Sequence, residues 1–238
     1  MFGTGGRIGI VVPANNATLE PEIWAHLPRD AAVYCTRILA KGDLTPDAVH
    51  DMEQHFERAV EELHATGVDV LVYADMVTTF IMEPNWNAER TAAMASRTGI
   101  VCTSAWTALE AALQALGARR IALGTPYPRG VHALVPPFFA RPGYDLASND
   151  TLDILAMTDV PKVPGKTVRD FATGLRREGA QAIVLLATDL PTFSEIEAIE
   201  AETGLPVLTS NQVILWNALR LCGNKTRIGG LGRLLREH

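Results

Sequence analysis

The chain has 238 residues, of which 47% are hydrophobic and 20% charged, and its formal net charge is −6. This composition excludes a disordered chain, and no apolar run approaches the ~18 residues that a membrane span needs. The basic residues are scattered, so neither nucleic acid nor a membrane is an expected partner. The first residues lack a basic region followed by an apolar one, so we expect no signal peptide and a cytoplasmic location.

The first half of the chain alternates apolar runs and amphipathic stretches. Strands are predicted over residues 7–13 and 31–39, and the apolar spacing predicts one long helix over 45–66. The run that begins at Val68 is short and rich in β-branched residues, which is typical of a strand buried on both faces of a parallel sheet. A helix over 87–97, a short strand over 98–104 and a helix over 105–116 follow.

Asp75 comes directly after this buried run. In open α/β sheets, ligands bind in the crevice outside the carboxyl ends of the strands, so Asp75 lies where chemistry is expected. The alternative is that Asp75 caps the next helix or accepts hydrogen bonds from loop amides, as Asp at such turns commonly does.

The pattern starts again after Gly117. The sequence pattern of three segments recurs later in the chain: residues 120–126 resemble 7–13, residues 182–189 resemble 70–75, and residues 203–210 resemble 98–104. The interval from Pro13 to Ala74 is 61 residues, and so is the interval from Pro126 to Ala187. This repeat is longer than the period of roughly 20–50 residues that solenoids show, so it indicates two similar α/β halves.

We therefore predict an α/β fold with two pseudo-symmetric Rossmann-like halves, each a parallel four-stranded sheet flanked by helices. The first half is assigned to residues 1–117 with a returning C-terminal helix at 217–238, and the second half to residues 118–216. Such halves bring the carboxyl ends of matching strands face to face, so the active site is expected in the cleft between them.

Polar side chains lie at the predicted strand ends around this cleft. Asn16 and its turn can hold a carboxylate or cap a helix. Arg37 can pair with a substrate carboxylate or be a surface arginine, and Tyr127 can donate to a ligand or only form a wall. The candidate substrate-binding residues are Asn16, Thr78, Tyr127, Thr188, Ser104, Ser210, Asn211 and Arg37.

Cysteine and histidine spacing points to no metal and no disulfide. Cys35, Cys102 and Cys222 form no pair-spaced motif, which argues against a disulfide framework and against a zinc site. The six histidines are dispersed along the chain. We therefore predict no metal site.

Several phrases carry a resemblance that covers nearly the whole chain. They are Val12-Pro13 with Asn16, Thr18, Glu20 and Glu22; Thr36-Arg37 followed by Thr45-Pro46; Ser210-Asn211-Gln212; Trp216 to Arg220; and Leu231 to Leu234. In order and spacing they resemble the aspartate/glutamate racemase superfamily, in particular its branch of maleate cis-trans isomerase and arylmalonate decarboxylase. The resemblance implies a substrate-binding role for Asn16 and a ligand contact for Tyr127.

The chain departs from this family at the acid–base residues. The superfamily's racemases use two facing cysteines, one after each half's central strand, on opposite sides of a carbon next to a carboxylate. Here the first position is Asp75, and ungapped matching makes the second Ala187. A partly desolvated Asp75 near Asp189 can have a raised pKa and act as general acid or base. If Asp189 faces the cleft, the two act from two sides; if it caps the following helix, Asp75 acts alone.

The resemblance implies a cofactor-independent isomerase that acts by proton transfer next to a carboxylate of a small organic acid, with Asp75 and Asp189 as the catalytic candidates. One alternative is a decarboxylase-like lyase with Asp75 as proton donor. Others are a carboxylate-binding homologue without activity and a hydrolase in which Asp75 activates water. The expected partner is a small carboxylate substrate, and a homo-oligomer, either dimer or tetramer, is left open.

Overall fold

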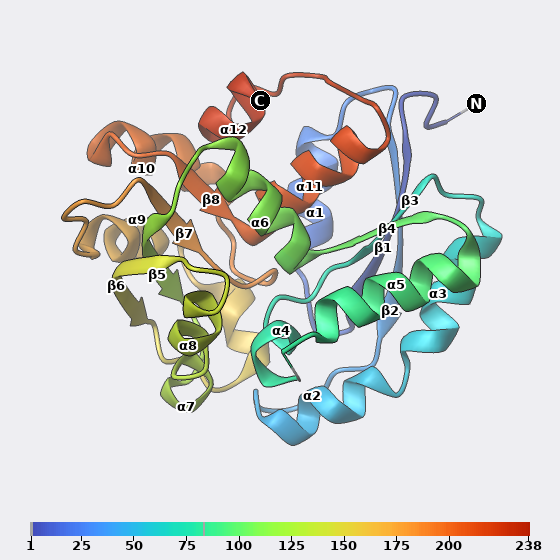
Figure 1. Cartoon of the computed structure of the whole chain (residues 1–238), viewed down its shortest axis with the longest axis horizontal. Helices are drawn as coiled ribbons and strands as arrows, with labels where there is room; N and C mark the ends of the chain where they lie inside the picture. Colours follow the sequence, from blue (N-terminus) through green and yellow to red (C-terminus); the bar gives the residue numbers. More distant parts are fainter. Residues whose placement is uncertain (1, 83) are drawn as a thin grey trace.

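Two parallel sheets form the frame of the molecule (Figure 1). The computed structural model describes residues 2–82 and 84–238. The first sheet has the order β2-β1-β3-β4 and the second the order β6-β5-β7-β8, with neighbouring strands parallel. The fold predicted from the sequence is confirmed. The strands are β1 Arg7–Pro13, β2 Ala32–Ile38, β3 Val70–Tyr73, β4 Val101–Ser104, β5 Arg120–Thr125, β6 Asp145–Thr151, β7 Ala182–Leu185 and β8 Val207–Thr209.

Helices begin where the local sequence supplies a cap. The Thr45 hydroxyl accepts from the backbone N–H of Ala48 at 3.2 Å, and Thr209 with Gln212 forms a reciprocal capping box. The helices of the first sheet's half are α1 Leu19–His26, α2 Pro46–Glu53, α3 Phe56–Ala65, α4 Thr78–Ile81, α5 Trp86–Thr98 and α6 Ala105–Ala115. Those that follow are α7 Arg129–His132, α8 Val135–Ala140, η1 Met157–Lys162, α9 Gly165–Gly174, η2 Phe193–Glu195, α10 Ile196–Thr203, α11 Ser210–Leu221 and α12 Gly232–Glu237.

The central strands carry the core. Every residue of β3 and of β7 is buried, as expected for continuous runs of Val, Leu and Ile in a parallel sheet. Full burial of one such side chain contributes about 1.5–3 kcal/mol, so these strands are the firmest parts of each half. The edge strands β2 and β6 are mostly half-buried or exposed.

The predicted single helix over residues 45–66 is wrong. The chain forms α2 and then α3, with Gln54 and His55 between them. Their backbone N–H groups bond to the carbonyls of Asp51 and Met52, three residues back, so the last turn tightens and the axis breaks. As a result α3 packs on β1 and β2, while α2 is free to pack against α4.

The two halves match at their central strands. Tyr73 at the end of β3 pairs with Val11, and Leu185 at the end of β7 pairs with Gly124. Val11 and Gly124 each lie two residues before the proline that closes the first strand motif of their half. Tyr73 and Leu185 are therefore equivalent positions.

This register corrects the repeat by one residue. Asp75 and Ala187 each lie two residues beyond these equivalent strand ends, so they correspond to one another. The equal intervals of 61 residues instead align Ala74 with Ala187. The difference arises because the stretch from Gly124 to Leu185 is one residue shorter than the stretch from Val11 to Tyr73.

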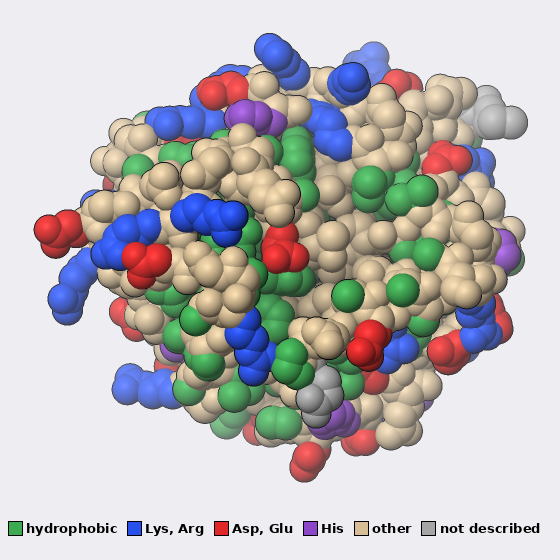
Figure 2. Space-filling model, in the orientation of Figure 1, with side chains coloured by type: hydrophobic (Ala, Val, Ile, Leu, Met, Phe, Trp, Pro, Cys, Tyr) green, Lys and Arg blue, Asp and Glu red, His purple; other side chains and the backbone are tan. Residues whose placement is uncertain are grey.

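Helices α6 and α11 lie side by side at the centre of the molecule (Figure 1). Ten of the twelve residues of α11 are buried, and this helix also contacts α1 and β3. The assignment of residues 1–117 with 217–238 to one half and 118–216 to the other stays a prediction. In the described part of the chain, no helix has the length and apolar character to cross a membrane. Figure 2 shows basic side chains interspersed with acidic ones on this face.

Candidate functional site

The turns that follow β1, β3, β5 and β7 meet at one cavity. One lining residue lies at or just after the end of each of these strands: Pro13, Asp75, Tyr127 and Ala187, respectively. The described residues that line the cavity are Pro13, Asn15, Asn16, Ala40, Leu44, Ala48, Val49, Met52, Asp75, Val77, Tyr127, Ile154, Met157, Val160, Ala187, Thr188 and Asp189. Its position at the carboxyl ends of both sheets is where α/β folds bind ligands.

Asp75 is a buried carboxyl group held by the start of α4. Its side chain is 7% exposed, and Oδ2 accepts from the Thr78 hydroxyl and, at 3.3 Å, from the Thr78 backbone N–H. Burial raises the pKa of Asp75, while the bonds from Thr78 and the backbone N–H groups of Met76 and Val77 oppose that rise. Thr78 therefore holds Asp75 in place and stabilises its ionised form.

Asp189 reaches the same cavity from the second sheet. Burial raises the pKa of Asp189 to about 7, and the negative charge of Asp75 contributes to the rise. Two carboxyl groups that interact in this way lose their protons in separate steps. Near neutral pH the Asp189 carboxyl group is therefore partly protonated.

The Tyr127 hydroxyl is a buried donor that no described residue engages. Burial, with the charges of Asp75 and Asp189, raises the pKa of Tyr127 well above its ordinary value, so the phenol keeps its proton. A buried hydroxyl without a partner costs about 1–3 kcal/mol. Tyr127 is part of the cavity lining, so its free hydroxyl is a candidate donor to a ligand oxygen.

Asn16 and Thr188 form a polar corner between the halves. Asn16 Oδ1 accepts from the backbone N–H groups of Thr18 and Leu19, both at 3.0 Å, which fixes the amide orientation at the start of α1. Its Nδ2 donates to Thr188 Oγ1 at 3.1 Å, and the Thr188 hydroxyl can in turn donate into the cavity. Asn16 thus caps the start of α1 and lines the cavity, while its contact with a carboxylate stays a prediction.

Four other candidates lie outside the lining of the cavity. Ser210 Oγ accepts from the Ala187 backbone N–H at 3.1 Å, and Asn211 Nδ2 donates to the Thr188 carbonyl at 3.0 Å. Ser104 caps α6 through the Thr107 N–H, and Arg37 pairs with Glu20 and donates to the carbonyl of Asn16 at 2.7 Å. Their direct contact with substrate stays a prediction.

One wall of the cavity is apolar, and sequence reasoning missed it. Its side chains come from the loop before α2, from α2 itself, and from the segment between β6 and α9. These two loops join where Leu44 N–H donates to the Leu155 carbonyl at 3.0 Å and where Asp43 pairs with Ala156. Apolar spacing assigned Val49 to an ordinary helix core. The wall consists of Ala40, Leu44, Val49, Met52, Ile154, Met157 and Val160.

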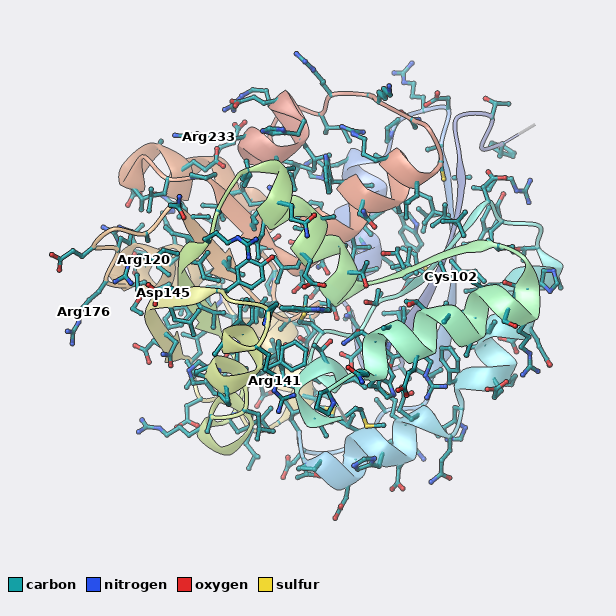
Figure 3. The ribbon with its side chains drawn as sticks, in the orientation of Figure 1. Cys102, Arg120, Arg141, Asp145, Arg176 and Arg233 are labelled. Carbon is teal, nitrogen blue, oxygen red and sulfur yellow. The ribbon has the colours of Figure 1, made fainter. Side chains whose placement is uncertain are left out.

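Thiol chemistry is absent from the described lining. Of the residues that line the cavity none is a cysteine, and Ala187 lies there with a φ of 96°, which costs a non-glycine residue about 1–3 kcal/mol. Cys102, labelled in Figure 3, lies on the edge strand β4. Burial raises the pKa of Cys102 and of Cys222 to about 11, and raises that of Cys35 further still, so all three remain thiols.

Within residues 2–82 and 84–238, no three His, Cys, Asp or Glu side chains cluster in a way that would hold a metal ion.

Comparison with known proteins identifies a family. The family model described as arylmalonate decarboxylase matches residues 8–235. A maleate isomerase of Nocardia farcinica is 30% identical, with 97% of this chain and 96% of that protein covered, and an arylmalonate decarboxylase of Bordetella bronchiseptica is 28% identical, with 95% and 92% covered. A solved mutant of the Nocardia farcinica maleate cis-trans isomerase, with a covalently bound succinylcysteine intermediate, gives a TM-score of 0.91 at 29% identity and covers 98% of this chain and 99% of its own. These relatives support an isomerase, with a decarboxylase as the alternative.

Replacing Tyr127 by Phe should separate stability from binding. The free energy of unfolding of the unliganded protein should stay the same or rise, because the change removes a buried hydroxyl that lacks a partner. Binding of a small dicarboxylate should weaken by about 0.5–1.5 kcal/mol, the net worth of one hydrogen bond. Urea unfolding and titration calorimetry measure the two effects. Tyr34→Phe, outside the cavity, is the control, and a Tyr127→Phe protein that is less stable yet binds normally would contradict the assignment.

Proposed function

Because this chain belongs to the arylmalonate decarboxylase family, we propose that it is a cofactor-independent isomerase that moves a proton next to a carboxylate of a small organic acid. In this proposal Asp75 takes the place of the usual cysteine. One observation carries it: two carboxyl groups, one from each half, line the same cavity, and the charge of Asp75 helps to raise the pKa of Asp189.

The roles of the two carboxyl groups follow from their surroundings. Asp75, which accepts hydrogen bonds from Thr78, is the base, and Asp189 with its pKa of about 7 is the acid. The Asp75 carboxylate removes a proton from the carbon next to the substrate carboxylate, and the electron pair moves into that carboxylate. The Asp189 carboxyl group then gives its proton to the opposite face of the carbon. Each residue ends in the other's starting state, and exchange with solvent resets both.

The charge that develops on the substrate needs hydrogen-bond donors. Tyr127 and Thr188, which both carry hydroxyls, line the cavity beside the two carboxyl groups. Donors that are fixed in place before the reaction contribute about 2.7–4 kcal/mol each to the transition state in measured cases. The Tyr127 hydroxyl fits this role because no described residue competes for it.

Covalent cysteine chemistry of the kind that the Nocardia farcinica relative displays does not fit this chain. Its described cavity lining contains no cysteine, and burial keeps its three thiols protonated. A carboxylate base accounts for proton transfer without a thiolate.

A decarboxylase-like lyase is the second candidate, and the apolar wall favours it. Side chains such as Leu44, Met52 and Val160 suit a substrate with an apolar substituent on the carbon that bears the carboxylates. In this reaction the carbon–carboxylate bond breaks, carbon dioxide leaves, and one carboxyl group protonates the remaining carbon.

Replacing Asp75 by Asn should leave the fold intact and lower turnover of a small carboxylate substrate by about 10²- to 10⁴-fold, the usual contribution of a general base. Steady-state rates with matched circular dichroism spectra measure this. Asp153→Asn is the control, since Asp153 pairs with Arg129 on the surface. Turnover within about threefold of the wild type in Asp75→Asn would end the proposal.

The rate should depend on pH through Asp189. Its acid form is lost as pH rises through its pKa of about 7, so turnover should fall above that value. At low pH the rate should fall again as Asp75 becomes protonated. A profile of kcat against pH measures both limbs. A rate that keeps rising well above pH 7 would show that Asp189 is not the proton donor.

Turnover in deuterated water should separate the two reactions. An isomerase should place deuterium in recovered substrate, because it exchanges the proton on the reacting carbon in both directions. A lyase acting on a substituted malonate should place one deuterium on one face of the product, with none in recovered substrate. Mass spectrometry and proton NMR read both labels.

A further inference from the structure

A chain of four oxygen atoms leads from Asp75 away from the cavity. The Thr78 hydroxyl donates to Asp75 Oδ2, and Thr78 Oγ1 lies 3.4 Å from the Tyr73 hydroxyl. The Tyr73 hydroxyl also makes a hydrogen bond with Glu53 Oε1, whose partner oxygen accepts from Arg90 Nη2 at 2.7 Å. Proton transfer to substrate makes no use of Tyr73, Glu53 or Arg90, so these buried groups call for a reason.

The oxygen chain is buried along its length and opens at Arg90. Tyr73 and Thr78 are 0% exposed, and the side chain of Glu53 is 7% exposed, against 22% for Arg90. The guanidinium of Arg90 lies 4.2 Å from the centre of the Phe56 ring, which holds it against Glu53. Water therefore reaches the oxygen chain at the Glu53 end.

The oxygen chain has room for one proton more than its two hydroxyls supply. Three contacts join the four oxygens, and each contact needs one hydrogen to be a hydrogen bond. The hydroxyls of Thr78 and Tyr73 supply two. When the 3.4 Å contact between Thr78 and Tyr73 is also a hydrogen bond, the third hydrogen comes from a carboxyl group, either Asp75 or Glu53. These two states differ only in which oxygen each hydrogen is bonded to.

We propose that Asp75 and Glu53 share one proton through Thr78 and Tyr73, and that Glu53 is a positioning residue that sets the ionisation state of Asp75. The catalytic consequence rests on the proposed function. There, Asp75 takes a proton from the substrate, and transfer along the oxygen chain to Glu53 returns Asp75 to its ionised form. In this transfer Asp75 gives its proton to Thr78, Thr78 gives its own to Tyr73, and Tyr73 gives its own to Glu53. Three O–H bonds break, three form, and one negative charge moves from Glu53 to Asp75.

Charged groups on every side bias where this proton lies. Burial and the charge of Asp75 raise the pKa of Glu53, while Tyr73 and Arg90 lower it. Across the cavity Asp189 and Tyr127 face Asp75, and, besides burial, the charge of Asp75 raises the pKa of both. A base at Asp75 requires the state in which Asp75 is ionised and Glu53 is protonated. Arg90 then allows Glu53 to release its proton to solvent.

The test follows the carboxyl carbons of Asp75 and Glu53 by NMR across a pH titration of the unliganded protein, labelled with ¹³C in its Asp and Glu carboxyl groups. Asp75→Asn and Glu53→Gln each delete one signal and so assign it. Two carboxyl groups that share a proton shift together over the same pH steps, so the two signals should have common midpoints. Asp189→Asn identifies any step that Asp75 shares with Asp189 instead.

Two variants should remove the shared step from the Asp75 curve. Tyr73→Phe keeps the ring that packs on Trp86 but removes the bridging hydroxyl, and Glu53→Gln removes the titrating partner. Both should also lower kcat with little change in KM. Glu195→Gln is the matched control, because Glu195 is another largely buried glutamate paired with an arginine, Arg169. It should leave the Asp75 curve unchanged.

The outcomes separate this inference from the proposed function. If Asp75 and Glu53 titrate with different midpoints, or if Tyr73→Phe leaves the Asp75 curve as in the wild type, the shared proton is overturned, even where Asp75→Asn abolishes turnover. If the two signals share their steps while Asp75→Asn remains active, the shared proton stands and the catalytic role of Asp75 falls. A Glu53→Gln protein that fails to fold leaves Tyr73→Phe to decide.

Discussion

The half-buried carboxyl group of Glu22 makes the hydrogen bonds on which the site depends. Glu22 lies on α1, and its oxygens accept from the backbone N–H groups of Thr192 and Phe193 at 2.6 and 2.7 Å and from Asn211 Nδ2 at 2.7 Å. A charge in such surroundings is stable only when its hydrogen-bond partners are fixed. These bonds tie the first strand's turn to the segment after β7 and to α11. They therefore set how far apart the residues that line the cavity can be.

Further contacts between the halves run through the site itself. Thr18 donates to the carbonyl of Asp189 at 2.8 Å, and Asn16 donates to Thr188. The residues that join the two halves are thus neighbours in sequence of the residues that face the ligand. Any change in the relative position of the sheets moves Asp189 with respect to Asp75. The packing of the two halves therefore determines the distance between the two carboxyl groups.

The sequence predicts the parts of this arrangement that have a strong local signal. The run over residues 7–13 becomes β1 with the expected bounds, and the buried run after Val68 places Asp75 at the carboxyl end of β3, because a continuous β-branched run suits only a buried strand. The break at Gln54 was beyond local reading, since the apolar spacing continues across it. The roles of Glu22 and Glu53 depend on partners far away in the chain, and an isolated glutamate in a helix looks the same whether buried or exposed.

The electrostatics of the cavity connect binding to protonation. Its described lining holds two carboxyl groups and no lysine, arginine or histidine, so a substrate anion enters a space that already disfavours negative charge. The Tyr127 and Thr188 hydroxyls and nearby backbone amides offset part of that cost, as neutral donors can. The remaining repulsion is reduced when one carboxyl group keeps its proton, which burial already favours at Asp189. An anion in the cavity raises that pKa further, because like charges disfavour ionisation. In the proposed mechanism, substrate binding therefore favours the protonated form of Asp189 that the reaction needs. A lysine in the same wall would bind the anion more tightly but leave Asp189 without its proton.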